Sequence, residues 1–163
     1  MIRHAMIREI EHEGSQTKKI LERIPFNKFG WKPHEKSREI GKLAVHVAEI
    51  PRWASRIVTT NEFDPIAARL TLSEVHNNEE LIKLSEIIIQ KAIEDLKNAS
   101  DEAMMEPWTF KRNGQPFFTL PRAAAVRAMA MNHLVHHRGQ LTVYLRLLNI
   151  SVPGLYGPSA DEM

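Results

Sequence analysis

The chain has 163 residues, with 22 Lys or Arg against 20 Asp or Glu, a formal net charge of +2 and a pI near 9.0. At this length we expect one domain over residues 1–163, large enough to bury a hydrophobic core. The nearly balanced charge predicts a mixed, solvated surface and no nucleic-acid partner, because a nucleic-acid binder needs a basic stripe on one face. The chain has no cysteine, which excludes disulfides, zinc–thiolate sites and a thiol nucleophile of its own.

The sequence also has no apolar run of about 18 residues, the length typical of a transmembrane helix. The first residues, Met1 to His4, lead into an acidic stretch and lack the apolar core of a signal peptide. We therefore expect a cytoplasmic protein without a membrane partner.

Apolar residues spaced three and four apart predict two helices in the first part of the chain. The first covers about residues 2–23 and ends before Pro25. The second covers about residues 37–59 and contains Pro51. Pro51 has no N–H to donate to the Val47 carbonyl, so we expect a kink there. The kink either opens the bundle locally or merely curves the helix.

Two further helices are predicted in the second half of the chain. The third covers about residues 78–98, and Asn77 with Glu80 resembles a capping box at its start. The fourth covers about residues 121–149 and begins at Pro121, a residue favoured in the first turn of a helix.

A small β-hairpin is predicted between the third and fourth helices. Asn113-Gly114 is a strong signal for a two-residue turn, and Trp108 and Phe110 before it alternate with polar residues. Pro116 should keep its strand at the edge of the sheet. The tail from Val152 contains several Pro and Gly residues and should be irregular. The predicted fold class is therefore all-α, a four-helix bundle with a small β-hairpin between helices 3 and 4 and an irregular C-terminal tail.

Three of the eight histidines lie within the segment from Asn132 to Gln140 of the fourth predicted helix. His133 and His137 are four residues apart, so a helix places them on one face, a turn apart. That face is otherwise apolar and should point into the bundle. His46 lies on the apolar face of the second predicted helix, so three histidines are expected to point inward from two helices.

Two interpretations of these three histidines remain open on spacing alone. A histidine on an apolar face is usually a hydrogen-bonded core residue. Burying three imidazoles without partners would, however, cost about 1–3 kcal/mol for each unsatisfied group. One divalent metal would satisfy a nitrogen on each ring. Three imidazoles with an open fourth position are typical of a catalytic metal site.

Glu49 and His136 each have two possible roles. Glu49 follows His46 by three residues and could be a fourth ligand, but we favour an ion pair with Arg52 or Arg56. His136 lies on the flank of its helix, where it either hydrogen-bonds to the ligand side chains or belongs to the surface, and we favour the surface.

Four segments together carry a resemblance to a known family. They are His46-Val47-Ala48-Glu49, Trp108-Thr109-Phe110, the run from Asn132 to Leu141, and the tail from Val152 to Glu162. With them the chain resembles DinB/YfiT-type members of the bacterial DinB-like superfamily, and the likeness covers nearly the whole chain.

This resemblance implies a four-helix bundle in which His46, His133 and His137 bind one divalent transition metal, which is zinc, nickel or iron in the family. It also implies a homodimer, and it implies neither DNA binding nor polymerase activity. Characterised relatives include enzymes that use low-molecular-weight thiols as S-transferases or isomerases.

We therefore expect a DinB-like, divalent-metal-dependent enzyme whose three-histidine site activates a small thiol, as an S-transferase, or water, as a hydrolase, against a small electrophilic substrate. The alternative is a metal-binding or structural dimeric bundle without catalytic activity. An enzyme needs an open coordination position that faces a cleft, whereas a fourth protein ligand such as Glu49 would close a structural site.

Overall fold

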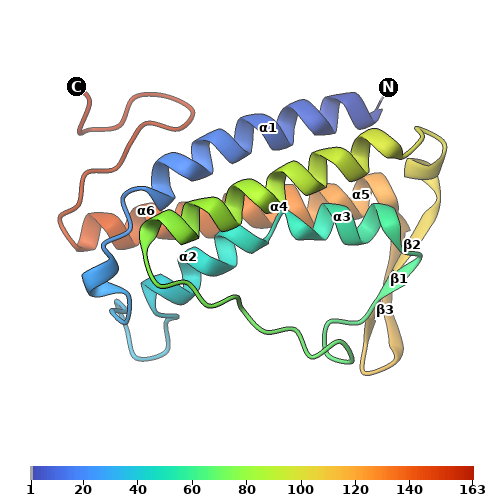
Figure 1. Cartoon of the computed structure of the whole chain (residues 1–163), viewed down its shortest axis with the longest axis horizontal. Coiled ribbons are helices and arrows are strands. Elements are labelled where there is room, and N and C mark those ends of the chain that lie inside the picture. The colour runs from blue at the N-terminus through green and yellow to red at the C-terminus, as the bar shows by residue number, and fades with distance from the viewer. Residues whose placement is uncertain (1) are drawn as a thin grey trace.

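The computed structural model describes residues 2–163 and shows a bundle of helices with a small sheet at one end (Figure 1). Across these residues the helices form four long stretches. These are α1 (Ile2–Leu21), α2 with α3 (Ile40–Glu49 and Arg52–Thr59), α4 (Asn78–Asn98), and α5, η3 and α6 in succession (Arg122–Val126, Arg127–Asn132 and His133–Leu147). α1 and α2 both pack against α4 and α6. The predicted four-helix bundle is confirmed.

The α4 helix begins where its capping signal placed it. The side-chain oxygen of Asn77 accepts a hydrogen bond from the Glu80 backbone N–H at 2.8 Å, and Glu80 in turn accepts one from the His76 backbone N–H at 2.8 Å. These contacts satisfy donors that the first turn of a helix leaves free.

The second predicted helix is divided at Pro51, as its missing N–H requires. α2 ends at Glu49 and α3 begins at Arg52, and the helix starts at Ile40, a few residues later than predicted. The segment before it holds only a short 3₁₀ turn, η1 (Phe26–Lys28). The break gives α3 a direction of its own toward the sheet end of the bundle (Figure 1).

The fourth helical stretch is not a uniform α-helix, because η3 is a π-helix. Its buried positions include Val126, Ala130, Leu134 and Arg138, which are spaced by four residues three times in succession. The twelve-residue span from Val126 to Arg138 is about one residue longer than three turns of a regular α-helix. The wider π turn takes up this excess and keeps both halves of the stretch facing the core.

The predicted hairpin is present and belongs to a three-stranded sheet. β2 (Pro107–Arg112) and β3 (Gln115–Pro121) are antiparallel, and the turn residues Asn113 and Gly114 have φ values of +52° and +77°. β3, which contains Pro116, is an edge strand as expected. A short strand, β1 (Glu62–Phe63), pairs in parallel with β2 and was not predicted.

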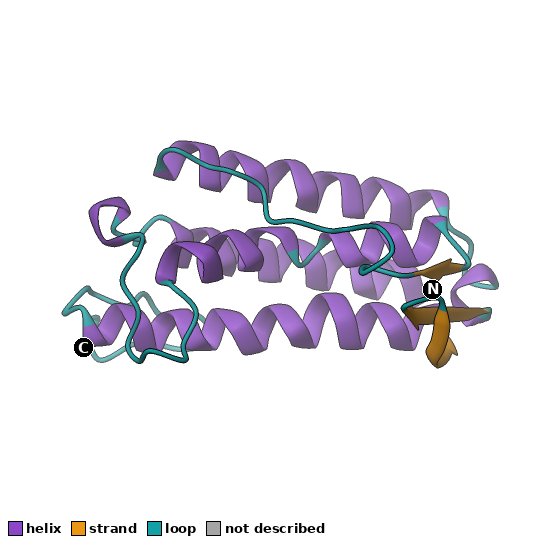
Figure 2. Cartoon of the chain, turned by 90° about the horizontal axis from the view of Figure 1, so that it is seen from below, coloured by secondary structure: helices purple, strands orange, loops and turns teal. Residues whose placement is uncertain are grey.

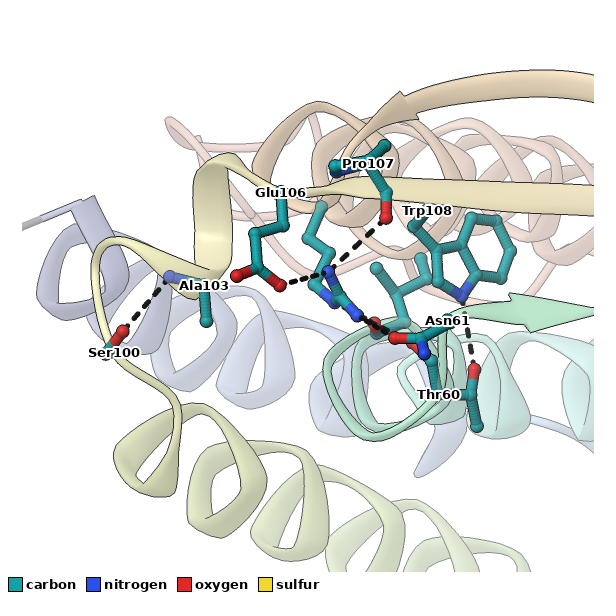
Figure 3. A network of polar contacts seen from close by, with 9 residues as sticks. Thr60, Asn61, Ser100, Ala103, Glu106, Pro107 and Trp108 are labelled. Carbon is teal, nitrogen blue, oxygen red and sulfur yellow. Dashed lines mark hydrogen bonds and ion pairs between the residues drawn. The ribbon is translucent and has the colours of Figure 1, made fainter.

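A buried arginine joins the sheet to the bundle, at the network of polar contacts that Figure 3 shows around Asn61, Glu106 and Trp108. The guanidinium of Arg122 donates to the backbone oxygens of Ile57 and Thr60, at 3.1 and 3.2 Å, and to the side chain of Asn61 at 2.6 Å. Nearby, the Trp108 indole N–H donates to the Thr60 hydroxyl at 3.2 Å. These contacts hold together the end of α3, the start of β2 and the start of α5. A short 3₁₀ turn, η2 (Ala103–Met105), precedes β2.

The loop between β1 and α4 runs along the length of the bundle (Figure 2). Its first part is fixed to the hairpin, because an Asp64 carboxylate oxygen accepts from the Gly114 backbone N–H at 2.7 Å. Its later part is fixed to α2, because Glu49 accepts from the Ser73 hydroxyl at 2.6 Å. The loop therefore covers one side of α2 and α3.

A second buried arginine fixes α6 and the tail against α1. Arg138 is 1% exposed, and its guanidinium lies 2.6 Å from Glu13 and donates to the Thr17 hydroxyl at 3.2 Å. It also donates to the Tyr156 hydroxyl at 2.6 Å, and Tyr156 donates to Glu13 at 2.8 Å. The irregular tail is thus held by a defined polar contact at Tyr156, although the ring itself is largely exposed.

Among residues 2–163 no helix combines the length and the apolar character that crossing a membrane requires.

The Arg138→Met variant should lose about 3–5 kcal/mol of unfolding free energy, because it leaves the buried Glu13 carboxylate without its cation. Urea denaturation would measure this loss. The double variant Arg138→Met with Glu13→Leu should recover most of it, because it removes both charges. A loss below about 1 kcal/mol in the single variant would contradict a structural role for the pair.

Asp161 predicts a pH dependence of stability. The paired guanidinium of Arg146, with help from the Val152 backbone N–H, lowers the pKa of Asp161 from 3.8 to about 2. Its contribution to stability is therefore present above pH 3.8 and is lost as the pH falls toward 2. The melting-temperature difference between the native protein and Asp161→Asn should shrink over this interval. For the control Glu35→Gln, which changes an exposed carboxylate, the melting-temperature difference from the native protein should not change over this pH interval.

Candidate metal centre

The three predicted histidines come together between α2 and α6. His46 projects from α2 toward His133 and His137, which lie one turn apart on α6. One ring nitrogen from each lies within 4.8 Å of the others, and the Nε2 atoms of His46 and His133 are 3.3 Å apart. Within residues 2–163, no carboxylate and no further histidine joins this group. The three rings are half-buried rather than central in the core.

Hydrogen bonds to the opposite ring nitrogen orient the two histidines of α6. Nδ1 of His133 donates to the Met129 carbonyl oxygen at 3.2 Å, since a carbonyl can only accept. Nδ1 of His137 lies 2.7 Å from Oε1 of Gln140 and donates to it. Each ring therefore carries its proton on Nδ1 and presents an unprotonated Nε2 toward the centre of the group. Metal-binding histidines commonly have this arrangement.

Burial keeps these imidazoles neutral. It lowers the pKa of His46 to about 3, and the charges of Arg38, His133 and His137 act in the same direction. Burial also lowers the pKa values of His133 and His137, although the hydrogen bonds to Met129 and Gln140 partly oppose these shifts. Neutral imidazole is the form that binds a metal.

Glu49 does not join the group of three histidines. One of its carboxylate oxygens accepts from the Ser73 hydroxyl at 2.6 Å and from the Ser73 backbone N–H at 3.3 Å, and it lies 3.5 Å from the Arg52 guanidinium. Of the two roles considered for Glu49, the ion pair with Arg52 is the one that the structure shows. The contact with Ser73 was not predicted, because 24 residues separate the two in sequence.

His136 is exposed, as expected, and it has an indirect contact with the group. Its Nε2 lies 3.2 Å from the amide nitrogen of Gln140, which can only donate. This contact orients the amide of Gln140 so that its oxygen faces His137. The role of Gln140 was not predicted, although its position three residues after His137 on a helix was a usable signal. The four remaining histidines are exposed and stand apart from the group: His4, His12, His34 and His76.

A cleft of about 210 Å³ lies beside His46. Arg52, Trp53 and Arg56 of α3 line one side, and Leu70 and Leu72 of the long loop line another. The break at Pro51 and the path of the loop create this cleft, so its walls come from segments that are distant in sequence. One histidine of the group, His46, therefore borders a space that a small molecule can enter.

Comparison with known proteins gives the same fold. YjoA from Bacillus subtilis, a DinB-like protein, is 17% identical, with a TM-score of 0.73 over 95% of this chain and 99% of that one. A DinB-like protein from Bacillus cereus ATCC 10987 is 22% identical, with a TM-score of 0.67 over 90% and 92%. YfiT from B. subtilis, described as a probable metal-dependent hydrolase with an unusual four-helix bundle topology, is 14% identical, with a TM-score of 0.65 over 91% and 89%.

The fold and the site define a helical bundle with three histidines gathered between two of its helices. The model of the DinB family matches residues 1–163, and the chain belongs to this family. By sequence it is also similar to the uncharacterised protein YrdA of B. subtilis strain 168, with 24% identity over 155 residues, covering 93% of this chain and 86% of that protein.

Proposed function

We propose that this protein is a divalent-metal-dependent enzyme whose metal is held by His46, His133 and His137. The observation that carries the proposal is the combination of three convergent imidazoles with a cleft on one side. The Nε2 atoms of His133 and His137 are aimed at the centre by hydrogen bonds on their Nδ1 atoms. Zinc, nickel and iron all accept imidazole nitrogen ligands.

The residues present fit such an ion. All three ligand atoms are neutral nitrogens and lie within the 4.8 Å that one ion could bridge. Glu49 is held by Ser73 and Arg52, so the protein supplies three ligands and leaves a position for an exogenous one. When bound, the ion supplies Lewis acidity and lowers the pKa of a coordinated water or thiol.

Hydrolysis of a small electrophilic substrate is the first form of this proposal. Support comes from the similar fold of YfiT, which is described as a probable metal-dependent hydrolase. Transfer of a small thiol is the second form. The chain has no cysteine, so the thiol would be a separate, low-molecular-weight molecule. In both forms the protein orients the nucleophile and the cleft beside His46 receives the substrate.

The native protein should bind one divalent metal ion per chain, and substitution of any of the three histidines should abolish tight binding. His137→Ala is the most direct test, with His12→Ala as the matched control because His12 is an exposed histidine outside the group. Metal content after dialysis would measure the effect. Retention of a full equivalent by His137→Ala would contradict the proposed ligand set.

Gln140→Leu should weaken metal binding about 10- to 100-fold, because His137 would lose the acceptor that holds its Nδ1 proton and ring orientation. A competition titration with a chelator would measure the affinity. The exposed Gln115, at the start of β3, offers a matched control as Gln115→Leu. Equal affinities for the two variants would show that the contact with Gln140 has no role in binding.

Spectroscopy and activity together would separate the forms of the proposal. In protein loaded with Co²⁺, an open position predicts that added thiol or anion changes the visible spectrum. A panel of small esters and amides, tested with and without a thiol, would then distinguish hydrolysis from thiol transfer. A spectrum unaffected by every thiol and anion, together with no turnover, would instead favour a structural metal site.

A further inference from the structure

Arg56 is the one half-buried arginine side chain among residues 2–163 that has neither an ion pair nor a hydrogen bond. The other buried or half-buried arginines all have such contacts. They are Arg3 with Lys97 and Ala99, Arg52 with Glu49, Arg122 with the α3–β1 segment, and Arg138 with Glu13. Removing a guanidinium from water without a partner is unfavourable. The N–H donors of Arg56 are therefore not used by the chain and can pair with a ligand.

Two aromatic rings hold the Arg56 side chain in place. Its guanidinium carbon lies 5.1 Å from the centre of the Trp53 ring and 4.8 Å from that of Phe63. The two rings are themselves in edge contact, with centroids 5.6 Å apart. Cation–π contacts at these distances restrict the guanidinium but occupy none of its N–H donors. The donors are thus positioned in advance and remain available.

The charges around the cleft favour an anion. Arg52 and Arg56 both line it, and Glu49 is the single carboxylate among its lining residues. That carboxylate already accepts from Ser73 and pairs with Arg52. The net charge of the lining is therefore positive, because one carboxylate faces two guanidinium groups.

The remaining surface of the cleft is apolar. Ile50 contributes from the break between α2 and α3, and Trp53 contributes from α3. Leu70 and Leu72 contribute from the loop, where 43% and 38% of their surfaces are exposed. A ligand that fits must therefore carry a compact apolar body as well as its charge. A free inorganic ion would leave these side chains in contact with water.

We propose that this cleft binds the anionic end of the substrate, a small organic molecule with a carboxylate or phosphate group attached to an apolar body. The guanidinium of Arg56 pairs with the oxyanion through parallel N–H···O hydrogen bonds, a geometry to which both groups are suited. The apolar body lies against Trp53 and the loop leucines. The role as a substrate site rests on the proposed function, because His46 belongs to the same cleft.

The test uses three probes of similar shape: benzoate, phenyl phosphate and the neutral benzamide. Isothermal titration of the zinc-loaded protein should show binding of benzoate, of phenyl phosphate, or of both, and their affinities distinguish the two oxyanions. Benzamide should bind at least about tenfold more weakly. In ¹H–¹⁵N spectra the bound anion should shift the indole signal of Trp53 and leave that of Trp31, which contacts Tyr144 at the other end of the bundle, unchanged.

Arg56→Gln should weaken binding of the anion about 10- to 100-fold, the loss expected for charged hydrogen bonds. Arg56→Lys should retain part of the affinity, because it keeps the charge but not the planar fork. Arg8→Gln is the matched control, since it removes the same charge from an exposed site on α1. Equal affinities of Arg56→Gln and Arg8→Gln would overturn the proposal, as would equal binding of benzamide and the anions.

A final set of measurements tests the anion site separately from the metal site. Arg56→Gln should keep its metal, and metal-free His133→Ala should still bind the anion with a shift of the Trp53 signal. If His133→Ala binds no anion while the zinc-loaded native protein does, the anion is bound by the metal and the Arg56 site is refuted. If the native protein binds no metal but the anion still shifts Trp53, the anion site stands and the metal proposal fails.

Discussion

The buried ion pair between Arg138 and Glu13 sets the rotation of α6, and the position of the histidine group depends on it. Successive residues of an α-helix are about 100° apart. With Arg138 directed at α1, His137 lies about 100° and His133 about 140° away in the same sense. Both therefore face α2, where His46 meets them. A rotation of α6 by one residue would place the histidines in the core and separate them from the cleft.

The π segment before α6 makes this rotation compatible with a continuous core. If residues 122–147 formed a regular α-helix, directing Arg138 inward would also direct Arg127 inward. Arg127 is instead exposed and pairs with Glu9 at 2.8 Å. The wide turn of η3 changes the register between the two halves. It lies immediately before His133 and supplies the Met129 carbonyl to which that histidine donates.

The cleft depends on a different set of long-range contacts. The break at Pro51 separates α3 from α2, Arg122 holds the end of α3 to the sheet, and the contact between Ser73 and Glu49 holds the loop over the helices. Glu49 therefore stabilises the wall of the cleft and is kept from the histidine group. The same contacts place Trp53 and Phe63 against Arg56, so Arg56 and His46 line one cleft.

Local signals in the sequence predicted the elements and the histidines well. Helical periodicity gave the four helical stretches, Asn77 with Glu80 marked the start of α4, Asn113-Gly114 marked the hairpin and Pro51 marked the break. The spacing of His133 and His137 predicted that they share a face. Each of these features arises from residues within a few positions of each other, where propensity and hydrogen-bonding capacity act directly.

The tertiary structure alone decided which charged residues are buried and what they contact. A single sequence marks Arg138 as a surface residue, because burying an arginine is unfavourable unless its partner is known, and Glu13 is 125 residues away. For this reason the predicted core stripe of the fourth helix ran through His133 and His137 instead of Leu134 and Arg138. The pairing of β1 with β2, the contact of Ser73 with Glu49 and the unpaired state of Arg56 likewise depend on segments that meet only in the folded chain.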